Sequence, residues 1–237
     1  MYGDEFSEIY VSYYEGKGKD YDAEAEEMVS LIRGRKADTA SLLDVACGTG
    51  EHLNRFGQLV EHVAGVELSE SMVAVGRDRF PHLSLHQGDM RDFDLGRTFD
   101  AVTCMFSSIG HSGDVEGLQS TAKRIGEHLV PGGVMVVEPW WSPEEFIDGY
   151  VAGGVVERDG RTIARVSHSE RVGDATKITV HMAVADAERG LRHFTEVGLL
   201  ALFTREQYLT AFDQAGIDAE YVTGGPLGRG LYVGTRR

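Results

Sequence analysis

The chain has 237 residues, 42% of them hydrophobic and 30 of them glycine, which is enough for one sizeable α/β domain that carries an elaboration. Its formal net charge of -15 at pH 7 repels nucleic-acid backbones at long range, so we expect no DNA or RNA substrate. No apolar stretch approaches the roughly 20 residues that a membrane span needs, so we expect no membrane partner either.

Residues 1–36 are predicted to form two helices, an aromatic one over residues 5–14 and a longer one over residues 20–35. From residue 41 onward, short runs of β-branched residues alternate with helical patterns. The expected strands cover residues 42–46, 63–67, 83–86, 100–105 and 134–138, and the expected helices begin at Glu51, Glu70 and Val115. This alternation predicts an α/β fold with a Rossmann-like, doubly wound and mostly parallel sheet.

After Pro139 the pattern changes to the period of two that is typical of antiparallel strands, at residues 163–168 and 178–184. We therefore expect an antiparallel β insertion at residues 140–201, which contributes to substrate binding or to dimerisation. Its end is marked by a predicted helix at residues 205–215.

Two further strands, at residues 217–223 and 230–235, are expected to complete a seven-stranded sheet. The predicted core domain therefore comprises residues 1–139 and 202–237. Residues 1–36 form a helical lid in this interpretation.

A tight turn follows the first expected strand, at residues 42–50, where the sequence reads LLDVACGTG. A strand that runs into such a turn and then into a helix exposes backbone amides at the positive end of the helix, where a ligand can approach closely. Glu67 ends the next strand, 19 residues beyond Gly48, where a carboxylate can accept hydrogen bonds from both hydroxyls of a ribose. This spacing alone also suits a dinucleotide.

Two details favour S-adenosylmethionine (SAM) over NAD. The turn has Asp44 four residues before its Gly-x-Gly pair, and Leu53 where the third glycine of a dinucleotide-binding turn would fall, so it makes less provision for a pyrophosphate. Asp89 and Met90 follow the third strand and offer an acceptor for an adenine amino group and a thioether to cover the ring. The adenosine half is accounted for without a second nucleotide.

These motifs resemble the class I SAM-dependent methyltransferases in order and spacing, with Ala46 where many members have glycine. The resemblance implies SAM as the cofactor and S-adenosyl-L-homocysteine as its product. It also implies a cofactor site formed by Tyr10, Tyr14, Lys17, Asp44, Ala46, Gly48, Gly50, Glu67, Leu68, Asp89, Met90 and Met105.

Further motifs narrow the family. They are GKGKDY at residues 16–21, DMRDF at 89–93, CMFSSIGH at 104–111, VEPWW at 137–141 and GGPLGRGL at 224–231. Together they resemble the dTDP-amino-sugar N,N-dimethyltransferases of macrolide biosynthesis, which complete desosamine and mycaminose. The similarity extends through essentially the whole chain. It implies two successive methyl transfers to the 3-amino group of a dTDP-3-amino-deoxyhexose, and a homodimer.

His111 is the candidate base. Methyl transfer is an in-line displacement, and a protonated amine has no lone pair to give, so a nearby group must accept its proton. The fourth strand ends at the edge where open α/β sheets bind ligands, and the loop after it carries His111 over this edge. The alternative is an exposed loop histidine that caps the helix after Asp114.

Tyrosines of the first helix are candidates for closing the site. By family resemblance, Tyr2 is a catalytic residue that contacts the sugar amine, and Tyr10 contacts the cofactor near its sulfonium. A lid of phenolic side chains can orient an amine while it excludes water. The alternative is that Phe6, Tyr10, Tyr13 and Tyr14 only pack the helix onto the sheet.

The diphosphate of such a substrate requires cations in an acidic protein. Arg229 lies among glycines that let its guanidinium approach a phosphate with two hydrogen bonds. Arg165 and His168 on the insertion are further candidates for binding the nucleotide. Trp141 is expected to stack on thymine or to shape the sugar pocket, with a place in the core as the alternative.

No metal site is predicted, because the histidines are scattered over different elements and the two cysteines, Cys47 and Cys104, lie near no histidine pair. Two cysteines are also too few for a disulfide framework. Together with the acidic N-terminus, which is unlike an export signal, this indicates the cytoplasm.

Three other functions stay open at this point. The first is an N-methyltransferase for a 4-amino dTDP-sugar or another small amine, which would use the same cofactor pocket. The second is a SAM-binding regulator without turnover. The third is an NAD oxidoreductase, which the missing third glycine disfavours.

Overall fold

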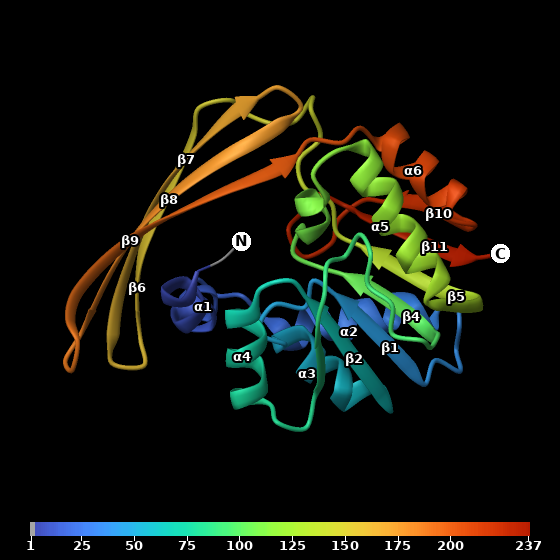
Figure 1. Ribbon diagram of the computed structural model, residues 1–237, viewed down its shortest axis with the longest axis horizontal. Helices are drawn as coiled ribbons and strands as arrows, with labels where there is room; N and C mark the ends of the chain where they lie inside the picture. Colours follow the sequence, from blue (N-terminus) through green and yellow to red (C-terminus); the bar gives the residue numbers. More distant parts are fainter. Residues whose placement is uncertain (1–2) are drawn as a thin grey trace.

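A seven-stranded sheet forms the centre of the computed structural model, which describes residues 3–237 (Figure 1). Its strands lie in the order β10-β11-β5-β4-β1-β2-β3. Their bounds are β1 Ser41–Val45, β2 His62–Glu67, β3 Ser84–Gln87, β4 Phe99–Cys104, β5 Leu129–Val137, β10 Ile217–Val222 and β11 Leu231–Arg236. The neighbours from β3 to β5 are parallel, whereas β11 is antiparallel to both β5 and β10. The carboxyl ends of β1 to β5 therefore meet at one edge.

Helices cover both faces of this sheet. Those of the core are α2 (Tyr21–Arg33), α3 (Glu51–Leu59), α4 (Glu70–Arg79), α5 (Val115–Glu127) and α6 (Arg205–Gln214). Alternate strand residues pack to opposite sides, since Leu43 and Met135 lie in one cluster with α5 and α6, whereas Leu42 and Val134 lie in another with α2 and α3. The predicted doubly wound, mostly parallel sheet is confirmed. In the described range 3–237, no helix is long and apolar enough to cross a membrane.

A second sheet stands apart from the core, between β5 and α6 in the chain (Figure 1). Its antiparallel strands are β6 (Tyr150–Arg158), β7 (Arg161–Val172), β8 (Ala175–Asp186) and β9 (Gly190–Ala201). The predicted antiparallel insertion is confirmed, although the sequence indicated only parts of β7 and β8. Two adjacent glycines, Gly153 and Gly154, interrupt the strand pattern of β6, and β9 has polar and apolar residues on both of its faces.

Helix α1 (Asp4–Gly16) lies between the insertion sheet and α4 (Figure 1). Its Phe6, Ile9 and Tyr13 form a buried cluster that also contains Met72 of α4 and Ile163 of β7. Glu8, on the same helix, forms ion pairs with three arginines of the insertion sheet, which are Arg161, Arg189 and Arg192. The helix therefore joins the two sheets and brings its remaining tyrosines to the edge where β1 and β2 end.

Candidate active site

The turn after β1 has an open backbone. Gly48 has a φ of 57°, and a Cβ at this position would meet nothing within 4 Å. Gly50, with a φ of 82°, is the N-cap of α3. It supports the turn but does not line the cavities of the site. Ala46 also adopts a positive φ, of 58°, which costs a residue with a side chain on the order of 1 kcal/mol. Glycine at this position would avoid this cost.

Asp44 is a buried carboxylate beside the turn, with 2% of its surface exposed. The Thr103 hydroxyl of β4 donates to its Oδ1 at 2.7 Å. Burial raises the pKa of Asp44 to about 7, against the hydrogen bond from Thr103, and the nearby Glu67 raises it further. A ligand that brings a positive charge would stabilise the ionised carboxylate.

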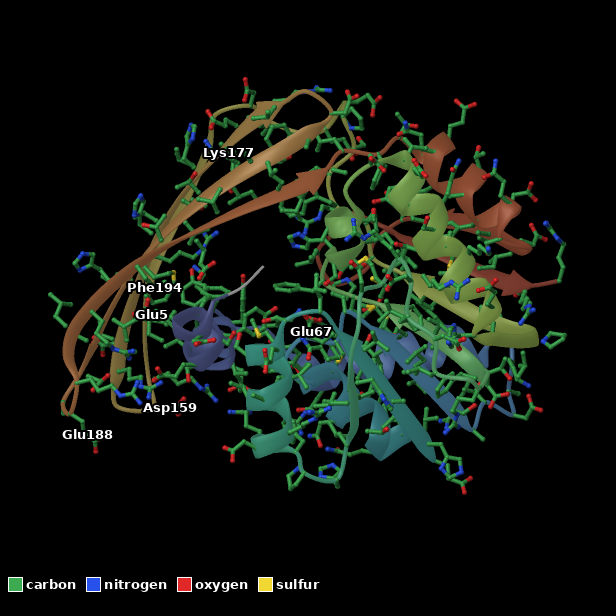
Figure 2. The ribbon with its side chains drawn as sticks, viewed as in Figure 1. Glu5, Glu67, Asp159, Lys177, Glu188 and Phe194 are labelled. Atoms are coloured by element: carbon green, nitrogen blue, oxygen red, sulfur yellow. The ribbon has the colours of Figure 1, made fainter. Side chains whose placement is uncertain are left out.

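Glu67 ends β2 and is held by two backbone amides. The N–H of Gly48 donates to Oε2 at 3.0 Å, and the N–H of Ser69 donates to Oε1 at 2.8 Å. Burial raises its pKa, whereas the two amides lower it. Figure 2 shows Glu67 on the side of the core that faces α1. The amides fix the carboxylate in one orientation, ready to accept from a ligand.

Asp89 follows β3 and forms an ion pair with Arg91. The Arg91 Nε lies 2.9 Å from Asp89 Oδ1, and its Nη2 lies 2.5 Å from Oδ2. The hydrogen bonds from Arg91 lower the pKa of Asp89, against a smaller effect of burial. Asp89 is therefore an ionised acceptor at neutral pH.

One cavity of about 260 Å³ joins these elements to the insertion sheet. It is lined by most of the residues that the sequence singled out, namely Tyr10, Tyr14, Ala46, Gly48, Glu67, Leu68, Asp89, Met90, His111, Arg165 and Arg229. A smaller cavity of about 30 Å³ adjoins it and is lined by Asp44 and Met105, with Gly48 shared between the two. Most of the predicted cofactor and substrate residues thus line one of two neighbouring cavities.

Aromatic rings line the same space. The ring centroids of Tyr10 and Tyr14 are 4.7 Å apart, and those of Tyr14 and Phe106 are 4.9 Å apart in an edge-to-face arrangement. Burial raises the pKa of Tyr14 to about 12, so its phenol stays neutral at neutral pH. Faces of aromatic rings attract cations, which includes a sulfonium. Tyr2, the predicted catalytic tyrosine, lies outside the described residues.

Lys17 lines neither cavity. A Cβ on Gly154 would lie 3.0 Å from Lys17 Nζ, so this side chain covers strand β6. Lys19 lines the smaller cavity instead, with Nζ 2.7 Å from Glu24 Oε2 and 4.0 Å from the centre of the Phe106 ring. The resemblance implied Lys17 and not Lys19 for the cofactor site. The chain turns between the two lysines at Gly18, which has a positive φ of 88°, and this turn could not be read from the sequence.

His111 lies on the short 3₁₀ helix η1 (Ser108–Ser112) after β4 and is exposed to the larger cavity. Burial by surrounding protein atoms lowers its pKa, against a hydrogen bond with the backbone of Leu199. Helix α5 is capped by Asp114, whose Oδ1 accepts from the Gly117 N–H at 2.8 Å. The alternative role of His111 as a helix cap is therefore wrong.

Arg229 lies in the loop between β10 and β11. Its Nη2 donates to Ser107 Oγ at 3.0 Å, and its guanidinium lies 4.8 Å and 5.0 Å from the ring centres of Trp140 and Trp141. Its Nε is buried and has no hydrogen-bond partner within residues 3–237. Burial lowers the pKa of Arg229, against the attraction of Glu138. A half-buried cation at a cavity wall suits an anionic ligand.

Two of the predicted substrate residues, Trp141 and His168, line neither cavity. Trp140 lines the larger cavity and Trp141 does not, although the Arg229 guanidinium lies near the rings of both. Arg165 lines the cavity, whereas His168, three positions along β7, points to the opposite face of the sheet. Over residues 3–237, no group of three or more His, Cys, Asp or Glu could hold a metal ion.

Known proteins resemble the chain along its whole length. The family described as Methyltransferase domain matches residues 42–133. The chain is 53% identical over 234 residues to the dTDP-3-amino-3,4,6-trideoxy-alpha-D-glucopyranose N,N-dimethyltransferase of Streptomyces venezuelae, with 99% of both proteins covered. It is 45% identical over 236 residues to the dTDP-4-amino-2,3,4,6-tetradeoxy-D-glucose N,N-dimethyltransferase of Saccharopolyspora spinosa, with 100% of this chain and 94% of the relative covered.

Solved structures agree with this comparison. The crystal structure of DesVI from Streptomyces venezuelae has a TM-score of 0.95 and 53% identity, over 97% of this chain and 98% of that one. The structure of SAM-bound CalS10, an amino pentose methyltransferase of Micromonospora echinaspora involved in calicheamicin biosynthesis, has a TM-score of 0.89 and 49% identity, over 97% of both chains. The likeness includes the insertion sheet as well as the core.

Proposed function

Because the chain belongs to the SAM-dependent N,N-dimethyltransferases of dTDP-amino sugars, we propose that it methylates the 3-amino group of a dTDP-3-amino-deoxyhexose twice. One observation carries the proposal: a single cavity is lined both by Glu67 and Asp89, which suit SAM, and by His111 and Arg229, which suit the acceptor. Donor and acceptor can therefore align in one space, as a direct transfer requires.

The residues around the turn fit SAM. The open space at Gly48 leaves room for its methionine end, and the Asp44 carboxylate suits the α-ammonium there. Glu67 is oriented to accept from the ribose hydroxyls, and Asp89 to accept from the adenine amino group. When bound, SAM supplies a methyl group on a positively charged sulfur, and the faces of the neighbouring tyrosine rings stabilise this charge.

His111 accepts the proton that the acceptor ammonium must lose. Its lowered pKa keeps the imidazole unprotonated near neutral pH, so it can take the proton and leave a lone pair on the amine. The nitrogen–carbon bond then forms as the carbon–sulfur bond breaks. The first transfer leaves a secondary ammonium, and since His111 is exposed to the cavity, it can pass its proton to water before the second round.

Arg229 and Arg165 approach the cavity from different parts of the fold, the first from the core and the second from the insertion sheet. Two guanidinium groups can bind the two phosphates of a nucleotide sugar with charge-assisted hydrogen bonds. Trp140 lies beside Arg229 at the same wall and offers an aromatic face to the sugar or the thymine.

We expect Arg229→Ala to raise the KM for the sugar nucleotide about 20-fold and to change kcat less than about 3-fold, because the guanidinium contributes binding that is equal in the ground state and the transition state. Steady-state kinetics with saturating SAM measure both constants. Arg97→Ala is the matched control, since Arg97 also packs on an aromatic ring, at 4.6 Å from Phe99, but lines neither cavity. Equal losses in kcat and kcat/KM would contradict this role.

The function itself is tested by incubating the pure protein with SAM and a dTDP-3-amino-deoxyhexose and following the product by mass spectrometry. We expect the addition of one and then two methyl groups. A parallel incubation with a dTDP-4-amino sugar tests the alternative acceptor, which the 45% identical relative supports. The 3-amino acceptor is preferred here because the relative named for it is 53% identical. No mass change with either sugar would remove the proposal.

We also propose that the protein is a homodimer and that it works in the cytoplasm. The outer face of the insertion sheet has exposed Val155, Val166 and Leu199, and apolar side chains of this kind suit an interface between two copies. Light scattering of the purified protein measures whether its mass is that of one chain or of two. The free thiols of Cys47 and Cys104 support the reducing compartment.

A further inference from the structure

The insertion sheet places a carboxylate in the larger cavity, and this carboxylate has no role in the methyl transfer proposed for His111 and Arg229. Glu196 lies on the inner face of β9, is half-buried, and lines this cavity. Its Oε1 accepts a hydrogen bond from the Gly3 N–H at 3.2 Å. Among the side chains of residues 3–237, no Lys, Arg or His forms an ion pair with it. Within residues 3–237, the Glu196 carboxylate therefore lines the cavity without a positively charged side chain as an ion-pair partner.

The other two carboxylates of the cavity are committed to different partners. Glu67 accepts from the backbone amides of Gly48 and Ser69, and Asp89 is paired with Arg91. Both lie at the ends of core strands, on the side that suits the nucleoside of SAM. Glu196 lies across the cavity from them, on the insertion, where the acceptor residue Arg165 also lies.

Glu196 and His111 line neighbouring parts of the wall. Gly198 is two positions from Glu196 on the same face of β9, about 7 Å along the strand. A Cβ on Gly198 would lie 4.0 Å from His111 Cε1, and the backbone of Leu199 forms a hydrogen bond with the same imidazole. The absence of a side chain at Gly198 leaves the space between the carboxylate and the imidazole open to a ligand.

We propose that Glu196 binds the protonated amine of the acceptor sugar and presents it to His111, so that this residue sets the preference for amino sugars over hydroxyl-bearing sugars. The inference rests on the proposed function. An alkyl amine enters as an ammonium near neutral pH, and a carboxylate without a cation is its natural partner. One ammonium proton passes to His111, the lone pair forms the new nitrogen–carbon bond, and the electrons of the carbon–sulfur bond stay on sulfur.

The contact with Gly3 connects this step to the helical lid. Gly3 is the N-cap of α1, so Glu196 Oε1 holds the beginning of the helix that carries Tyr10 and Tyr14. A carboxylate has two oxygens, which leaves Oε2 for the ammonium. Binding of the amine and the position of α1 at the cavity thus depend on the same side chain.

Glu196→Gln tests the proposal, because it keeps the shape of the side chain and an oxygen for the Gly3 N–H while it removes the charge. Calorimetry is done on the protein saturated with S-adenosyl-L-homocysteine, with a dTDP-3-amino-deoxyhexose and with dTDP-glucose as ligands. We expect the affinity for the amino sugar to fall about 10-fold or more, and the affinity for dTDP-glucose to change less than about 2-fold. Glu188→Gln is the matched control, since Glu188 is exposed at the tip of the β8–β9 hairpin (Figure 2).

Two results would overturn the proposal. If Glu196→Gln lowers the affinity for both ligands equally, or leaves both affinities unchanged, Glu196 serves only to anchor α1. Methylation by the wild-type protein separates this outcome from a failure of the proposed function. If the wild type methylates the amino sugar and Glu196→Gln still prefers the amino sugar over dTDP-glucose, the proposed function stands and only the role of Glu196 is wrong.

Discussion

Replacing Asp44 by Asn is expected to weaken SAM binding about 100-fold and, at the same time, to stabilise the ligand-free protein. The Asp44 carboxylate is 2% exposed and accepts one side-chain hydrogen bond, from Thr103. The α-ammonium of SAM would supply the missing positive charge at this position, and Asn cannot form that ion pair. Loss of a charged partner in a buried site leaves the other charge uncompensated, which accounts for the large effect.

The effect on stability follows from the pKa of Asp44, which is raised from 3.8 to about 7. The folded protein binds this proton more tightly than the unfolded chain does. The contribution of Asp44 to the free energy of unfolding therefore rises as the pH falls from 7 toward 3.8, and the full cost of its buried charge is present above pH 7. A shift of about 3 units corresponds to about 4 kcal/mol, or on the order of 10 °C in Tm for a domain of this size.

Thermal unfolding of ligand-free wild type and Asp44→Asn, near pH 5 and near pH 8, measures this difference. We expect the variant to have the higher Tm at pH 8 and a smaller advantage at pH 5. Asp218→Asn is the control, because Asp218 is an exposed aspartate on β10. If the difference in Tm between wild type and variant is the same at both pH values, Asp44 does not change its protonation on folding. Calorimetric titration with SAM at pH 8 measures the loss of affinity.

The cofactor half of the cavity was predictable because its residues come from the ends of parallel strands. Asp44, Glu67 and Asp89 lie far apart in the sequence, but β1, β2 and β3 are neighbours whose carboxyl ends share an edge. Once the alternation of strands and helices is recognised, their proximity follows from the topology alone. No knowledge of any side-chain contact is needed for it.

The acceptor half was harder to predict because it depends on which face of an antiparallel strand points inward. Arg165 and His168 differ only by three positions, yet they lie on opposite faces, and a shift of one residue would exchange their roles. Glu196 has no sequence motif around it, and its place in the cavity depends on the register of β9 with β8. Lys17 and Lys19 likewise differ only in how the chain turns at Gly18.

Replacing His111 by Ala is expected to lower kcat about 100-fold at neutral pH, with a smaller loss at high pH. Burial lowers the pKa of His111 below 6.5, so in the wild type the imidazole is available to take a proton at neutral pH. Without it, turnover depends on the fraction of acceptor that is already unprotonated, and this fraction rises with pH. The variant should therefore recover activity as the pH approaches the pKa of the amine.

Values of kcat for both methyl transfers, measured with saturating substrates from about pH 6 to pH 10, test this role. The pH profile of the wild type should fall only below pH 6.5, in line with the lowered pKa of His111, whereas that of His111→Ala should rise across the whole range. His168→Ala is the matched control, because His168 lies on the outer face of the insertion sheet. If His111→Ala reduces kcat by the same factor at every pH, the imidazole only shapes the loop, and the base that serves the two transfers must be another group.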